Sequence, residues 1–234
     1  MNDPLTGTRR LGAVAGIAAV ALLVSIVAAT PAVPAPDRTI TEIAGSVAAH
    51  GDGMLFGAYL GGLMAVALLL FGAAATIVLR HAEADRSAWW IVALVGISAT
   101  SIGLVGDALQ VAWVDSARHG VRGDPLWALY TAPHMITIFT MLPLAVFLLG
   151  TGLGARASGA FPRWTAWLAI IISGSLAVGA GSSAGDELTG GPLAIPLLLG
   201  IAAFLIWTIA ISVSLWRARP VGRTAGATAA ELVA

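Results

Sequence analysis

Long apolar stretches, separated by short polar segments, alternate along most of this chain. Each stretch is about as long as a bilayer requires, because the hydrocarbon core is roughly 30 Å thick and a helix rises 1.5 Å per residue. The pattern predicts six membrane-spanning helices, at about residues 11–30, 54–79, 88–114, 126–150, 164–184 and 192–216. The expected fold class is all-α, a polytopic transmembrane helical bundle in one domain over residues 1–218, with a disordered tail over residues 219–234.

The charges between the spans predict the orientation of the bundle. All basic residues are arginine, and most of them fall on one side of the predicted membrane. Because cytoplasmic loops carry an excess of basic residues, we expect the arginine-rich side and both termini to be cytoplasmic. The outer side holds Arg38, Arg118 and Arg122; the inner side holds Arg9, Arg10, Arg80, Arg86, Arg156, Arg163, Arg217, Arg219 and Arg223.

The first span has an alternative interpretation as a cleavable signal peptide. Arg9 and Arg10 precede an apolar run that ends with the small residues Ala28 and Ala29. The run is longer than the roughly 7–15 apolar residues of a signal sequence, which favours a retained span. Cleavage would leave five spans without changing the orientation of the others.

The connection between the first two spans, residues 31–53, is the longest one on the outer side. Within it, Ile40, Ile43 and Val47 share one face at helical spacing. This spacing predicts a short helix over residues 39–49 that lies on the membrane surface.

Composition agrees with a membrane protein and excludes several classes of function. Charged residues make up 10% of the chain, whereas a soluble domain has about 25%. The formal net charge of zero gives no basic surface for nucleic acid. The absence of cysteine excludes disulfides, thiolate metal sites and cysteine nucleophiles. The bias toward alanine, glycine and valine is typical of a GC-rich bacterial genome, so the expected location is a bacterial cytoplasmic (plasma) membrane.

Small residues at helical spacing predict where helices pack. In lipid, helix association depends on close backbone approach, which glycine permits. Packing within one bundle is the simpler interpretation, and an oligomer through the Gly12/Gly16 or Gly57/Gly61 face is the alternative. Further small residues mark the third and fifth spans: Gly103, Gly106, Gly174, Gly179 and Ser183.

Asp107 is the polar residue that most needs an explanation. It lies about seven residues below the outer end of the third span, so roughly 10 Å into the membrane, where a carboxylate on an isolated helix costs about 2.5 kcal/mol. His134, on the fourth span, is expected at a similar depth. We therefore predict an outward-open polar pocket built on Asp107 and His134. Its other candidate residues are Tyr130, Gln110, Tyr59 and His50. The alternatives are a purely structural Asp107–His134 pair, or an Asp107 side chain that reaches up to the outer interface.

Three functions fit this cluster. The leading one is binding of a small ligand or lipid headgroup on the outer side, without catalysis. The second is a small proton-coupled transporter that uses Asp107 and His134, although no internal repeat is evident. The third is a membrane enzyme that acts on a lipid or quinone with His134 as acid and base. The expected partners are membrane lipids and an outer ligand, and we assign no catalytic residue, metal ligand or cofactor.

Two patterns imitate known motifs without their context. Residues 181–185 (GSSAG) match G-x-S-x-G, but a nucleophile elbow needs a strand-to-helix turn and a later histidine, and no histidine follows His134. Bis-histidine haem needs two histidines within the bundle, and only His134 lies clearly inside a span. Neither pattern changes the expected function.

Several short segments carry a resemblance. They are TRRL at residues 8–11 before a glycine- and alanine-rich span, HGD at residues 50–52, GAYLGG at residues 57–62, and short inner loops with arginine. In this layout, about the first two thirds of the chain resembles small six-span integral membrane proteins of unknown function from actinobacteria. The resemblance implies a six-span membrane protein and no particular activity.

Overall fold

The computed structural model describes residues 4–29, 39–83, 88–181 and 194–217, and the regular structure in these ranges is entirely helical. Six helical segments are long and apolar enough to cross a membrane, which confirms the predicted all-α bundle. The predicted tail over residues 219–234 lies outside the described residues, as do Ser183 and the adjoining ends of the last two predicted spans. The helices are α1 (Thr6–Ala29), α2 (Ile40–Glu83), α3 (Trp89–Ala99), α4 (Ile102–Arg118), α5 (Asp124–Ser158), α6 (Arg163–Ala180) and α7 (Ala194–Arg217).

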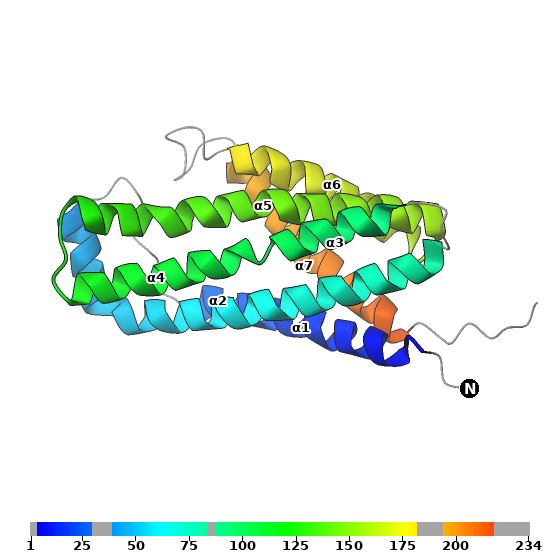
Figure 1. Cartoon of the computed structure of the whole chain (residues 1–234), viewed down its shortest axis with the longest axis horizontal. Helices are drawn as coiled ribbons and strands as arrows, with labels where there is room; N and C mark the ends of the chain where they lie inside the picture. Colours follow the sequence, from blue (N-terminus) through cyan, green and yellow to red (C-terminus); the bar gives the residue numbers. More distant parts are fainter. Residues whose placement is uncertain (1–3, 30–38, 84–87, 182–193, 218–234) are drawn as a thin grey trace, which may run out of the picture.

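The start of α1 and the end of α7 lie at the same end of the bundle (Figure 1). This arrangement agrees with an even number of spans between them. The opposite end holds the first turns of α2 and the connection between α4 and α5 (Figure 1). By the distribution of arginine, we call this opposite end the outer end and the end with the start of α1 the inner end.

The expected surface helix over residues 39–49 is instead the first part of α2. Thr39 and Glu42 form a capping box, in which the Thr39 N–H donates to Glu42 Oε2 (2.8 Å) and the Glu42 N–H donates to Thr39 Oγ1 (3.3 Å), so α2 begins here. Ile43 and Val47 do share a face, but they are buried inside the protein. The cluster that buries them also contains Met54, Trp113, Val114, Ala117, Leu126 and Tyr130. The apolar face of this part of α2 therefore packs against the outer ends of α4 and α5 of the same chain.

The third span is interrupted near its middle, where the sequence predicts one continuous helix. α3 ends at Ala99 and α4 begins at Ile102, and the hydroxyls between them bond to nearby backbone. Thr100 donates to the Ile97 carbonyl (2.6 Å), and Ser101 donates to the Ser98 carbonyl (2.7 Å). Such side-chain bonds compete with the helical ladder. At the same place the backbone N–H groups of Ser101, Gly103 and Leu104 donate to the carbonyl three residues back instead of four. Figure 1 shows the break, after which α4 packs on both α2 and α5.

Trp207 of α7 lies at the centre of the inner core. Its side chain is fully buried, and its ring lies edge-on to Phe71 and Phe147, each 5.9 Å away between centroids. Its indole N–H donates to the Thr165 carbonyl at 3.0 Å. The residue therefore joins α2, α5, α6 and α7, and its polar atom is satisfied, as a buried tryptophan requires.

Several predicted glycine contacts occur within this one chain. A Cβ on Gly12 would lie 2.5 Å from the Ala74 Cβ on α2, and one on Gly16 would overlap Ser212 on α7. Gly179 likewise contacts Leu197, whereas no atom lies within 4 Å of a Cβ built on Gly174. Close approach of α1 to α2 and α7 therefore accounts for Gly12 and Gly16 without a second copy, and an oligomer stays a prediction.

Candidate functional site

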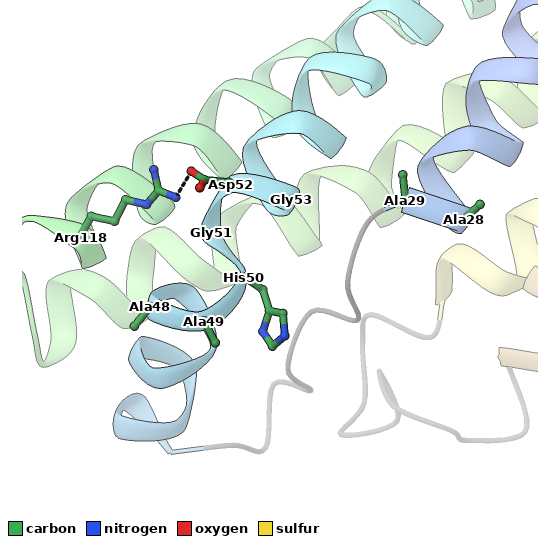
Figure 2. A pocket seen from close by; sticks show the side chains of 9 residues that line it. All are labelled: Ala28, Ala29, Ala48, Ala49, His50, Gly51, Asp52, Gly53 and Arg118. Atoms are coloured by element: carbon green, nitrogen blue, oxygen red, sulfur yellow. Dashed lines mark hydrogen bonds and ion pairs between the residues drawn. The ribbon is translucent and has the colours of Figure 1, made fainter.

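A pocket of 460 Å³ opens among the outer ends of α1, α2 and α4. Figure 2 shows it at a bend of α2, with the end of α1 on one side and the end of α4 on the other. Its lining residues are Ala28, Ala29, Ala48, Ala49, His50, Gly51, Asp52, Gly53 and Arg118. Most of the lining residues are small, so the polar contacts available to a ligand come from three side chains, those of His50, Asp52 and Arg118.

Arg118 and Asp52 form an ion pair across one side of the pocket. The Arg118 Nη2 donates to Asp52 Oδ1 at 2.6 Å, and the guanidinium lies against Gly51 (Figure 2). A Cβ at Gly51 would be 2.7 Å from Arg118 Nη2, so the glycine makes room for the cation. The Asp52 side chain is 97% exposed and that of Arg118 is 36% exposed. An ion pair this exposed contributes about 0–1 kcal/mol to stability, and its charges stay available to a ligand.

His50 provides the third polar group. Its side chain is exposed, and in Figure 2 its ring points into the space between the α2 bend and the end of α1 rather than toward Asp52. Within the described parts of the chain, no residue forms a hydrogen bond or ion pair with this ring. The pocket therefore presents a guanidinium, a carboxylate and an imidazole at the outer end of the bundle.

Asp107 does not pair with His134 among the described residues. Its carboxylate instead lies against α2, where a Cβ built on Gly61 would be 2.7 Å from Asp107 Oδ1. Gln110 shares this face and donates from Nε2 to the Met54 carbonyl of α2 at 3.3 Å. The side chain of Asp107 is half-buried, and no residue in the described ranges forms a hydrogen bond or ion pair with it.

His134 interacts mainly with its own helix. Its Nδ1 lies 3.3 Å from the Tyr130 carbonyl oxygen, and its ring lies 5.2 Å from the Tyr130 ring. Tyr130 is fully buried between Trp113 and Trp127. The prediction that Asp107 and His134 meet is therefore not realised in this structure. The physical reason is rotation: the face of α4 toward α5 holds Gly106, which lies near Ile136, and Asp107 follows it around the helix toward α2.

The predicted candidates thus separate into different environments. Among these candidates, His50 lines this pocket. Tyr59 is 63% exposed on the side of α2 that faces away from the bundle, where lipid is expected. Sequence reasoning omitted Asp52 and Arg118 from the candidates. The available signal was the rarity of arginine on the outer side, where Arg118 is one of three.

Comparison with other proteins adds no functional assignment. Within the described residues, no three histidine or acidic side chains come close enough to hold a metal ion. No family model, curated protein or solved structure matches this chain. The resemblance to six-span actinobacterial proteins therefore stays a prediction.

Proposed function

We propose that this multi-pass membrane protein binds a small zwitterionic ligand from the outer solution, without catalysis, at the pocket of His50, Asp52 and Arg118. The observation that carries the proposal is the pocket itself, which has a volume of 460 Å³ and opposite charges at one wall. Ligand pockets generally have volumes of about 300–1,000 Å³. A molecule of the size of an amino acid or a short peptide therefore fits this space.

The charges favour a ligand with both an acidic and a basic group. A guanidinium binds a carboxylate through strong charge-assisted hydrogen bonds, and Arg118 keeps donors that its single bond to Asp52 does not use. Asp52 accepts a hydrogen bond from the ammonium group of the ligand. His50, on the opposite side of the bend, contacts the remainder of the molecule and selects for its polarity.

The test is a binding screen in which amino acids and short peptides are added to protein in mild detergent. We expect at least one zwitterion to raise the melting temperature of the wild type. In Arg118→Gln, we expect its affinity to fall about tenfold or more, because a charge-assisted hydrogen bond contributes roughly 1.5–3 kcal/mol.

Arg122→Gln is the matched control for this screen. Arg122 is also an outer arginine, but its guanidinium donates to the Ala117 and Val121 carbonyls and it does not line the pocket. The variant should bind as the wild type does. Equal binding by wild type and Arg118→Gln, or no effect of any zwitterion, would refute the proposed pocket.

Proton-coupled transport is a second candidate function, and the interruption of the third span favours it. Transporters build their sites from broken helices near the membrane centre. The break at Thr100 and Ser101 lies near the middle of the span Trp89–Arg118, and the Asp107 carboxylate follows about two turns later.

This second candidate predicts proton uptake by proteoliposomes. A zwitterion identified in the screen should acidify the lumen of vesicles that contain wild-type protein and a pH-sensitive dye. Asp107→Asn should abolish the signal while it leaves binding at the outer pocket intact, because Asp107 lies apart from that pocket. Binding without any uptake by the wild type would reduce the function to ligand recognition.

A further inference from the structure

A second hollow, distinct from the outer pocket, runs between α1 and α7. It has a volume of 530 Å³ and an almost entirely apolar surface. We call it the α1–α7 groove; its lining residues are Ala13, Val14, Ile17, Ala18, Ala21, Ser212, Val213, Trp216 and Arg217. Along α1 it extends from Ala13 to Ala21, a length of about 12 Å.

The floor of the groove forms where α1 and α7 come closest. Ser212 is 1% exposed and lies directly against Gly16. The rims are formed by larger side chains that face outward, with Val14 59% and Ile17 48% exposed. The groove is therefore open to the side, toward the lipid that surrounds a membrane bundle.

Two arginines lie at the inner end of the groove. Arg217 lines it directly, and Arg10 lies one turn before Val14 on the same face of α1, a face that continues through Ile17 and Ala21. Both side chains are exposed, and neither forms an ion pair with any residue in the described ranges. Beside Arg217, Trp216 is 62% exposed, as is typical of a tryptophan at a membrane interface.

We propose that the α1–α7 groove binds an anionic phospholipid of the inner leaflet. One acyl chain lies along the apolar part between Ala13 and Ala21, and the phosphate of the headgroup binds the guanidinium groups of Arg10 and Arg217. The α1–α7 groove is apolar along its length and has two cations at one end. A phospholipid matches this arrangement, because its apolar acyl chain ends at a charged headgroup. Basic pockets between helices on the cytoplasmic side are suited to such headgroups.

The charges disfavour a second copy of the chain as the occupant. Two chains with the same orientation in a membrane would pair about an axis along the membrane normal. That contact would bring Arg10 and Arg217 of one copy toward the same residues of the other, and like charges across an interface repel. An anionic lipid removes this repulsion because it supplies the opposite charge.

The experiment is native mass spectrometry of delipidated protein in mild detergent, titrated with phosphatidylglycerol or with phosphatidylcholine. We expect one phosphatidylglycerol to bind the wild type more tightly than phosphatidylcholine does. The double variant Arg10→Gln/Arg217→Gln should lose this preference, at roughly fivefold in affinity for each arginine. The control Arg80→Gln/Arg163→Gln removes two inner arginines outside the groove and should keep the preference.

A second variant tests the apolar part independently of charge. Val14→Trp fills the groove and should reduce the binding of phosphatidylglycerol, whereas Val24→Trp, also exposed on α1 but outside the groove, should not. Equal affinity for the two lipids in the wild type would overturn the proposal. A second result would also overturn it: the wild type is a dimer, and Val14→Trp converts it to a monomer while lipid binding is unchanged. The occupant of the α1–α7 groove would then be a second copy of the chain.

Discussion

Replacing Gly96 by leucine is expected to separate α3 from α5 and to lower the free energy of unfolding by about 1–3 kcal/mol. A Cβ at Gly96 would lie 2.7 Å from the Phe147 Cα and 2.8 Å from the Pro143 carbonyl oxygen. These are backbone atoms, so no change of rotamer can relieve the overlap. The helices would have to move apart and lose their van der Waals contact, which is a main source of helix association in lipid.

A second glycine, on α5, allows the same close approach from the other side of the α3–α5 interface. A Cβ at Gly150 of α5 would lie 2.5 Å from the Ala93 nitrogen and 3.0 Å from the Ala93 Cα of α3. Gly96 and Gly150 thus let the backbones of α3 and α5 touch at two levels.

The measurement is unfolding of wild type and Gly96→Leu in mild detergent, followed by circular dichroism. Gly174→Leu is the control, since Gly174 is exposed and has no atom within 4 Å of an added Cβ. It should not lower the stability, because leucine has a higher helix propensity than glycine by roughly 0.5–1 kcal/mol. If Gly96→Leu unfolds at the same midpoint as the wild type, the close contact between α3 and α5 does not exist.

The sequence predicted the spans because their length and apolarity are set by the bilayer and are independent of neighbouring helices. It also predicted that Ile43 and Val47 share a face, since helical spacing is a local property. It did not predict what covers that face, because the partner comes from α4 and α5. Gly96 and Gly150 were missed for a similar reason: the sequence shows glycines at these positions, but only the packing shows that each lies against the backbone of the other's helix.

The candidate site was harder to predict because depth alone does not place two side chains together. Asp107 and His134 lie on adjacent helices, but contact also depends on the rotation of each helix about its axis. At the break near Thr100 and Ser101 the backbone bonds span three residues instead of four, which changes that rotation, and this local change is not visible in the hydropathy pattern. Arg118 was interpreted as a marker of orientation, although its position beside Gly51 gives it a second role in the pocket.

Replacing Asp107 by asparagine is expected to raise the free energy of unfolding by about 1–2 kcal/mol. A carboxylate within a span costs about 2.5 kcal/mol on an isolated helix, and an amide of nearly the same shape costs less. Among the described residues, none offers Asp107 a hydrogen bond or an opposite charge that would offset this cost. The neighbour is Gly61, whose lack of a side chain leaves room for the carboxylate without stabilising it.

Unfolding in bicelles, where the spans remain in lipid, is the measurement that checks this gain. Asp115→Asn serves as the control: the residue lies on the same helix, but its side chain is 65% exposed at the outer end, so the change should be close to neutral. A loss of stability in Asp107→Asn would show that the carboxylate has a stabilising partner and a structural role. A gain would mean that Asp107 lowers the stability of the fold, so its presence needs another explanation. Proton uptake by proteoliposomes then tests whether that explanation is transport. If the more stable Asp107→Asn variant has lost uptake, the carboxylate acts in transport; if uptake is unchanged, Asp107 has no role in that activity.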